Sequence, residues 1–284
     1  MRLALFASPA LAAALALFAA PVANAADPIA APTVTEPPSP FALHAEVDVT
    51  VLLTATAFWA LPVLFEDVLA KGNCQPCDPD GVNAFDRTAI GFHDEAAGTA
   101  SDIGAVGLPL LAAMGSFIDV EPFGWSAALE DVVLVAEAVA ISGAVNQVVR
   151  NAITRPRPFM YVADTAEENG RSHENFHSFY SGHTTTAFSA SIAFAYLFSV
   201  RRPESPWRYA VWGIAIAAAS AVGVCRVLAG AHFWTDVIAG AVAGSAFGVL
   251  TPALHLRGER RNGREGPQAR AVAGPGYASL YVRF

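Results

Sequence analysis

Long runs of small and aliphatic residues, separated by polar segments, are the dominant pattern along the chain. The runs exceed the roughly four to eight residues of a buried strand, and their Ala, Leu and Val content suits helices. The predicted helices cover residues 49–65, 104–118, 128–149, 184–200, 208–228 and 236–254. We therefore expect an all-α fold whose core is a six-helix bundle.

The polar segments and the two ends divide the chain into four parts. Residues 1–25 combine an early Arg, a long apolar run and an Ala-x-Ala ending, which predicts a cleaved secretory signal peptide. Residues 26–48 form a Pro-rich extended leader, because its prolines prevent a helix. The helical domain covers residues 49–255. An Arg/Gly-rich tail, residues 256–284, ends in an alternating pattern that predicts a short strand or hairpin.

Charge is distributed unevenly along the 284 residues, whose net charge is −8. The second half, from residue 150 onward, carries 14 of the 17 Lys and Arg residues but only 8 of the 25 carboxylates. A nucleic-acid-binding protein would favour a basic surface overall. An acidic protein with an arginine-rich half instead indicates a local site for an anion, and we expect no nucleic-acid partner.

The three cysteines fit an exported protein. Cys74 and Cys77 form a CxxC pair, for which a disulfide is the leading interpretation outside the cytoplasm. Redox chemistry would need a βαβ context and a metal site would need a second ligand pair, and the sequence predicts neither. Cys225 lies in an apolar run, which predicts a buried free thiol.

Apolar helices in an exported chain belong either to a water-soluble bundle or to a membrane domain. Six spans, with the arginine-rich tail inside, would place the start of the first helix in the cytoplasm. A secretory signal would instead leave that start outside. This mismatch favours a water-soluble bundle in the periplasm or cell envelope. Inner-membrane embedding stays open, because the mismatch disappears if the first helix does not span.

Three short motifs carry the candidate chemistry, and the first opens the fourth predicted helix. Ser181 can cap that helix, Gly182 lets the backbone approach a ligand, and His183 can transfer a proton beside an anion bound at the helix N-terminus. An ordinary serine cap with an incidental histidine is the alternative.

The second motif places two arginines at the end of the third predicted helix. Arg150 and Arg157 are separated by six residues, and the flanking prolines fix the direction of the exit. Two guanidinium groups at this separation can clamp a tetrahedral dianion. The alternative is that they only stabilise the helix end. Upstream, we expect Glu137 to be a buried partner of a site arginine.

The third motif joins the last two predicted helices. Arg226 is followed by His232 and Asp236, and the i, i+4 spacing of the last two would place them on one helical face. A carboxylate that accepts from one ring nitrogen leaves the other as a nucleophile. A capping Asp near a core histidine is the alternative. His173 and His177 have similar spacing, but we expect them to be solvated loop residues.

Together these segments, in this order over residues 150–236, resemble the signature of the type-2 phosphatidic-acid phosphatase superfamily. That superfamily contains lipid phosphate phosphatases, bacterial acid phosphatases and vanadium haloperoxidases. The departures are Arg150 for the usual Lys, Tyr180 for the usual Pro and Cys225 for the usual Ser.

The resemblance implies the superfamily's six-helix core and a role for each motif residue. His232 would be the nucleophile, oriented by Asp236, and His183 would protonate the leaving group. The phosphate-binding residues would be Arg150, Arg157, Ser181, Gly182 and Arg226.

We therefore expect an exported, metal-independent phosphatase that hydrolyses soluble or lipid-linked phosphomonoesters through a phosphohistidine. The alternative is a membrane-embedded lipid phosphate or polyprenyl diphosphate phosphatase, and a further alternative is a vanadate-dependent haloperoxidase. No cofactor is expected, and vanadate would act as a phosphate mimic. The expected partner is the phosphate ester, with membrane association in the lipid-linked case.

Overall fold

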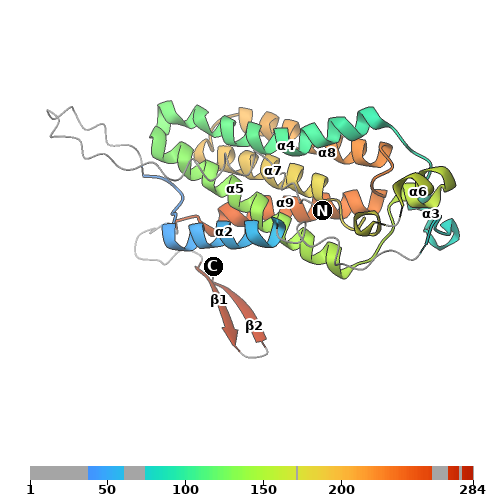
Figure 1. Ribbon diagram of the computed structural model, residues 1–284. Coiled ribbons are helices and arrows are strands. Elements are labelled where there is room, and N and C mark those ends of the chain that lie inside the picture. Colours follow the sequence, from blue (N-terminus) through green and yellow to red (C-terminus); the bar gives the residue numbers. More distant parts are fainter. Residues whose placement is uncertain (1–37, 61–73, 171, 258–267, 275–276, 284) are drawn as a thin grey trace, which may run out of the picture. The chain divides into compact units, whose positions relative to one another are not determined.

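A computed structural model describes residues 38–60, 74–170, 172–257, 268–274 and 277–283 (Figure 1). Its fold is all-α, as predicted. The predicted signal peptide and most of the leader lie outside the described residues. The helices are α2 (Ala45–Ala60), α3 (Ala84–Arg87), α4 (Glu95–Gly115), α5 (Val120–Ala152), α6 (Ala163–Asn169), α7 (Gly182–Arg201), α8 (Trp207–Leu228) and α9 (Trp234–Leu254).

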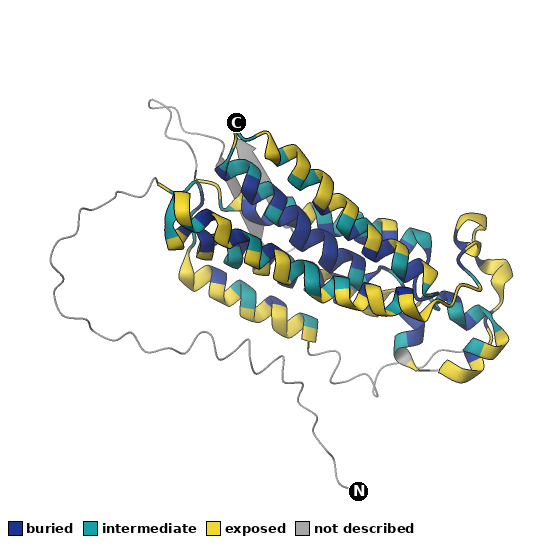
Figure 2. Cartoon of the chain, turned by 90° about the horizontal axis from the view of Figure 1, so that it is seen from above, coloured by how far each residue is buried: buried dark blue, intermediate teal, exposed yellow. Residues whose placement is uncertain are grey.

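Helix α7 lies at the centre of the bundle and packs against α4, α5, α8 and α9. Its small residues, from Ala187 to Ala195, are almost entirely buried. Helix α2 packs against α5, and α4 also packs against α8. Figure 2 shows buried positions on the inner faces of the helices and exposed positions on their outer faces.

The α7–α9 contact is unusually close because α9 carries a glycine at every fourth position. A Cβ added at Gly240, Gly244 or Gly248 would lie within 2.8, 2.5 or 2.9 Å of an atom of α7 or its cap. Real Cβ atoms are not found at such separations. The two backbones therefore approach each other as only glycine permits.

Helices α4 and α5 begin much earlier than the apolar runs predict, at residues 95 and 120 rather than 104 and 128. Helix α4 starts at Glu95, because the carboxylate of Asp94 caps it by accepting from the Ala97 N–H at 3.0 Å. Helix α5 starts at Val120 but bends at Gly124, whose φ of 85° a glycine adopts without strain. A capped first turn therefore extends α4, and the bend at Gly124 joins an additional short helical segment to α5.

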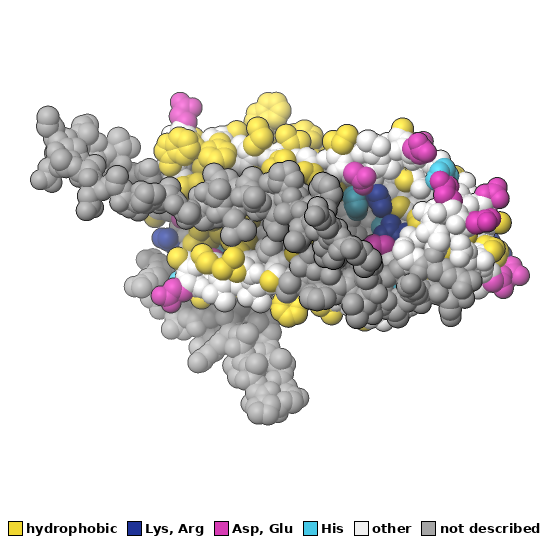
Figure 3. All heavy atoms as spheres, in the orientation of Figure 1, with side chains coloured by type: hydrophobic (Ala, Val, Ile, Leu, Met, Phe, Trp, Pro, Cys, Tyr) yellow, Lys and Arg dark blue, Asp and Glu magenta, His cyan; other side chains and the backbone are white. Residues whose placement is uncertain are grey.

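The outer faces of the bundle are apolar. Large hydrophobic side chains project outward from α4 and α8, among them Ile103, Leu111, Trp207 and Ile214, each more than 60% exposed. Figure 3 shows hydrophobic side chains gathered over the upper helices. A water-soluble monomer rarely exposes apolar surface of this extent.

Three helical regions are long and apolar enough to cross a membrane: Glu95–Ala152, Trp207–Leu228 and Trp234–Leu254. These regions favour membrane embedding over the water-soluble bundle that we expected from the helix count. That expectation required every helix to span. Among the described residues, α2 has 16 and is not one of the candidate spans, so the mismatch that favoured solubility disappears.

The remaining described features lie outside the bundle core. Strands β1 (Gln268–Gly274) and β2 (Tyr277–Arg283) pair antiparallel, so the tail contains a hairpin rather than a single strand. Cys74 and Cys77 are joined in a disulfide. Cys225 is a free thiol but only half-buried, because α8 lies at the outside of the bundle.

Candidate active site

The N-terminus of α7 forms one wall of the candidate site. Ser181 caps the helix: its hydroxyl oxygen accepts from the backbone N–H of Thr184 at 3.4 Å and from the Thr184 hydroxyl at 2.9 Å. Gly182 lies against Asn146, whose Oδ1 would be 3.0 Å from an added Cβ. The Asn146 amide in turn donates to the Tyr180 carbonyl at 2.7 Å. Buried polar contacts thus fix the start of the helix that carries His183.

The two arginines of the second motif converge on one carboxylate. Arg150 donates to Oε2 of Glu174 at 2.6 Å, and Arg157 donates to the same oxygen at 3.2 Å. Arg157 also donates through Nε to the Glu174 carbonyl at 2.9 Å. The two guanidinium groups therefore share a single anionic oxygen, as the clamp interpretation of their spacing requires.

A second carboxylate, Asp102 of α4, joins the third arginine to the first histidine. His183 Nε2 lies 2.8 Å from Oδ1 of Asp102, and Arg226 donates to the same oxygen at 3.1 Å. Arg226 is buried, and its Nε has no hydrogen-bond partner among the described residues. An unpaired buried donor is costly, so this N–H is well suited to an anionic oxygen of a ligand.

His232 is oriented by a backbone carbonyl. Its Nδ1 lies 2.8 Å from the Ser178 carbonyl oxygen, whereas the nearest oxygen of Asp236 is 3.7 Å away. The spacing of His232 and Asp236 thus brings the two side chains together, but at an ion-pair distance that is too long for the ring to donate a hydrogen bond to the carboxylate. His232 precedes α9 rather than lying on it, and Asp236 Oδ2 accepts from the Phe233 N–H at 3.0 Å instead. Nδ1 is still the donor, so Nε2 carries the lone pair.

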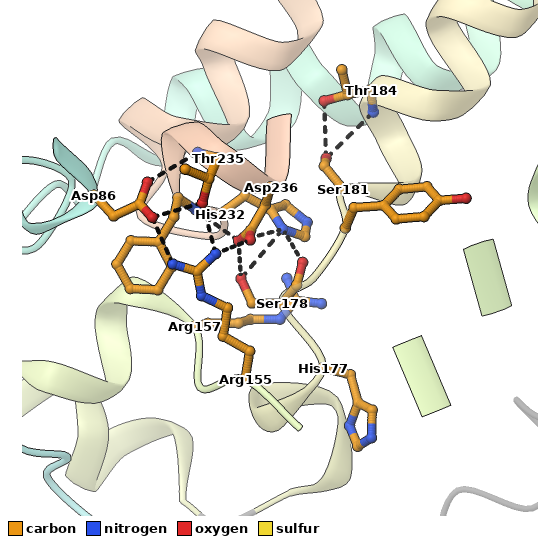
Figure 4. Close-up of polar contacts among 12 residues, drawn as sticks. Asp86, Arg155, Arg157, His177, Ser178, Ser181, Thr184, His232, Thr235 and Asp236 are labelled. Carbon is orange, nitrogen blue, oxygen red and sulfur yellow. Dashed lines mark hydrogen bonds and ion pairs between the residues drawn. The ribbon is translucent and has the colours of Figure 1, made fainter. Parts of the chain in front are cut away.

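A buried network behind His232 holds Asp236 in place (Figure 4). The Ser178 hydroxyl donates to Asp236 Oδ2 at 2.5 Å, and Arg155 donates to the other oxygen. Arg155 also donates to Asp86 at 2.7 Å, and Thr235 donates to the same Asp86 oxygen at 2.6 Å. One guanidinium thus links two buried carboxylates, and every oxygen of Asp236 is engaged.

The positive charges act on one another and on both histidines. Burial, together with Arg150 and Arg226, lowers the pKa of Arg157 to about 10. Burial and Arg226 lower the pKa of His183 to about 4, against the opposing effect of Asp102. Burial lowers the pKa of His232 to about 3, with Arg157 and Arg226 adding to the effect. The site therefore combines clustered cations with a neutral, nucleophilic imidazole at neutral pH.

The structure thus brings the residues of all three motifs into one site. Sequence reasoning missed five further members, which are Asp86, Asp102, Arg155, Glu174 and Ser178. Arg155 lies between the two motif arginines, and this position was a usable signal. The acidic residues gave none, because they come from distant, polar parts of the chain.

Two expectations near the site are wrong. His177 is buried, because its segment runs beneath the Arg150 guanidinium, which donates to the His177 carbonyl at 3.2 Å. Glu137 is buried as expected, but its partner is His255 rather than a site arginine. It lies more than three helical turns before Arg150 on α5, too far to reach the site.

Comparisons with known proteins match the part of the chain that contains this site. The family model described as the PAP2 superfamily matches residues 131–260, which include all three motifs. This match confirms the resemblance to the type-2 phosphatidic-acid phosphatase superfamily.

Two curated relatives are lipid A 1-phosphatases. The one from Rhizobium etli is 37% identical over 121 residues, covering 42% of this chain and 48% of the relative. The one from Rhizobium johnstonii is 37% identical over 123 residues, covering 42% and 46%. The chain thus spans about half the length of the curated relatives it matches.

Among solved structures, the chain is similar to a transmembrane PAP2-type phosphatidylglycerolphosphate phosphatase from Bacillus subtilis. The identity is 22% and the TM-score 0.44, over 72% of this chain and 94% of the other.

Proposed function

Residues 131–260 belong to the PAP2 superfamily, and from this premise we propose that the protein is a membrane-embedded phosphatase that hydrolyses a lipid phosphomonoester. The observation that carries the proposal is the convergence of Arg150, Arg157 and Arg226 around two histidines. Phosphoryl transfer requires mainly positioning and neutralisation of the charge on the transferred group. Three guanidinium groups supply both.

In the first step, Nε2 of His232 attacks phosphorus in line with the ester oxygen. The N–P bond forms as the P–O bond to the lipid breaks, and the departing alkoxide takes a proton from His183. Burial and Arg226 keep this ring neutral without substrate, and the negative charge of the bound phosphate stabilises its imidazolium form. The three arginines hold the equatorial oxygens, together with the backbone at Gly182. Ser181 contributes by fixing the helix N-terminus, since its hydroxyl oxygen is already the cap acceptor.

In the second step, His183, now neutral, removes a proton from water. The resulting hydroxide attacks phosphorus, the N–P bond breaks, and inorganic phosphate leaves with His232 restored. The Ser178 carbonyl keeps Nδ1 protonated throughout, and the Asp236 carboxylate offsets the positive charge that develops on the ring.

A lipid substrate is favoured by the surface around the site. Apolar side chains cover the outer faces of α4 and α8. The N-terminal half of α4 contributes Asp102 to the site, and the C-terminal end of α8 contributes Arg226. A phosphate held at the membrane boundary could therefore keep its acyl chains in the bilayer. The curated relatives, both lipid A 1-phosphatases, support the same class of substrate.

Neither step requires a metal ion. PAP2 phosphatases are metal-independent, which agrees with the expectation of no cofactor. Among the described residues, the one group with metal-ligand spacing lies at the other end of α9. Vanadate should compete with substrate as a phosphate mimic. The haloperoxidase alternative stays a prediction, and halide oxidation after loading with vanadate and peroxide tests it.

The deciding experiment is phosphate release by the full chain, purified in detergent. The panel contains lipid A, phosphatidate and p-nitrophenyl phosphate, presented in mixed micelles with EDTA. We expect the lipid substrates to be preferred. His232→Ala should lower kcat by about 10⁴-fold or more, because no other group can form the covalent intermediate.

The matched control is His93→Ala, since His93 is an exposed histidine outside the site. It should leave the rate unchanged. Full activity of His232→Ala would refute the assignment of His232 as the nucleophile. Equal rates on soluble and micellar esters would refute the lipid specificity while leaving the phosphatase reaction intact.

A further inference from the structure

A second cluster of ionisable side chains joins three helices at the far end of α9. Asp48 of α2, Glu137 of α5 and His255, which follows α9, each offer one ligand atom, and these three atoms lie within 4.8 Å of one another. Helix α9 has 21 residues, so this cluster lies about 30 Å from His232 at the other end of the helix.

The protonation of His255 determines what this cluster can hold. Nδ1 lies 2.8 Å from the Thr251 carbonyl oxygen, so it carries the proton and donates. In the neutral ring, Nε2 then presents a lone pair to Oδ1 of Asp48 at 3.4 Å and to Oε2 of Glu137 at 3.5 Å. Three electron-pair donors thus face one another, and either a proton or a metal ion between them would offset their repulsion.

The two distances to His255 fit a metal ion better than a shared proton. A charge-assisted N–H···O bond would shorten these contacts to about 2.7–2.9 Å. Ligand atoms that bind Zn²⁺ tetrahedrally at about 2.0–2.2 Å are instead about 3.4 Å from each other. The observed 3.4 and 3.5 Å match the tetrahedral separation.

The surroundings of the cluster support the same conclusion. A histidine that binds a metal through Nε2 usually donates Nδ1–H to a carbonyl, as His255 does. Asp48 is fixed by the backbone N–H of His44, which donates to its other oxygen at 2.6 Å.

Glu137 is the second, independent indication. Its side chain is 2% exposed, and its Oε1 has no hydrogen-bond partner among the described residues. A buried carboxylate oxygen without a partner is costly, and a bound cation would compensate for it.

We propose that Asp48, Glu137 and His255 form a binding site for a divalent transition metal of the Zn²⁺ type. The ion would tie α2 to α5 and α9, and His255, the most exposed of the three at 17%, would be the entry side. Its role is structural, and it does not depend on the proposed phosphatase activity.

The test is metal uptake by the full chain without a polyhistidine tag. Protein stripped with a chelator is dialysed against Zn²⁺ and measured by elemental analysis, and Co²⁺ serves as a spectroscopic probe of tetrahedral geometry. We expect one equivalent of Zn²⁺ and a visible band typical of tetrahedral Co²⁺. At a Zn²⁺ concentration 100 times the dissociation constant, the unfolding midpoint should rise by about 5–10 °C.

Glu137→Gln and His255→Gln should each lower the affinity for Zn²⁺. The loss should exceed the roughly 10–100-fold that follows removal of a residue that only hydrogen-bonds to a metal ligand. The matched controls are Glu46→Gln, an exposed carboxylate on α2, and His93→Gln, an exposed histidine away from the cluster. Wild-type protein that takes up no Zn²⁺ would overturn the proposal, even if the variants fail to fold. Equal uptake by wild type and both cluster variants would do the same.

Discussion

Glu174→Gln is the substitution that most directly probes the phosphate site. Oε2 of Glu174 accepts from both Arg150 and Arg157, so it lies where those arginines would hold a phosphate oxygen. A substrate must therefore exchange with this carboxylate. Glutamine keeps the shape of the side chain, and the backbone bond from Arg157 Nε to the residue 174 carbonyl remains. The change removes only the competing charge.

The magnitude follows from the two bonds that the carboxylate accepts. A buried hydrogen bond to a charged group contributes roughly 1.5–3 kcal/mol. The Glu174 side chain is 36% exposed, so solvent reduces its two bonds to about 1–2 kcal/mol together. Removing this competition should tighten the binding of a phosphate-like anion about 5- to 30-fold.

The assay is competitive inhibition of lipid phosphate hydrolysis by inorganic phosphate and by vanadate. We expect both inhibition constants to fall by the same factor in Glu174→Gln. Glu168→Gln is the control, because Glu168 is exposed on the neighbouring helix α6. Inhibition constants that stay constant or rise would refute the reasoning, since Glu174 would then support the arginines rather than compete with the substrate.

Three further predictions concern stability and the network behind the nucleophile. Gly244→Ala should lower the free energy of unfolding by about 1–3 kcal/mol, because the new Cβ would lie 2.5 Å from the Thr185 carbonyl oxygen. Gly213→Ala is the control and should leave the free energy of unfolding unchanged or nearly so, since its Cβ would have no neighbour within 4 Å. The pKa of His232, about 3, lies below its unfolded value of about 6.5, so the unfolded chain binds more protons between these values. The free energy of unfolding should therefore fall as the pH is lowered from 6.5 towards 3. In His232→Ala, the slope of this free energy against pH should be smaller by up to about 1.4 kcal/mol per pH unit. Arg155→Gln should lower kcat by about 10- to 150-fold with little change in KM, because Arg155 supports Asp236 without facing the substrate. A changed KM with a constant kcat in steady-state kinetics would contradict this role. The control is Arg257→Gln, at an exposed position.

The sequence predicted the helices well because apolar runs determine which segments can be buried. Their starts were less predictable. Asp94 extends α4 by capping it, and Gly124 allows α5 to bend and begin before its apolar run. The choice between a soluble and a membrane-embedded bundle depended on whether the first helix spans, which hydropathy alone did not decide.

The motif residues of the site could be predicted because each motif is local in sequence. The ion pairs that complete the site could not. Asp86 and Asp102 contact Arg155 and His183 across 69 and 81 positions, and only the folded chain brings them together. The i, i+4 spacing correctly placed His232 near Asp236, but it assumed a continuous helix, and α9 begins only after His232.

The glycine contact between α7 and α9 has a consequence for how such an enzyme could diversify. His183 and Asp236 stand on two backbones that cannot slide past each other without a clash or separate without losing close packing. Their relative positions, and with them the chemistry of the reaction, should therefore vary little among related enzymes. Asp102 and Glu174 come from other elements, α4 and the segment before α7. Selection for a new headgroup would therefore act on these rim positions, and directed evolution of specificity should begin there.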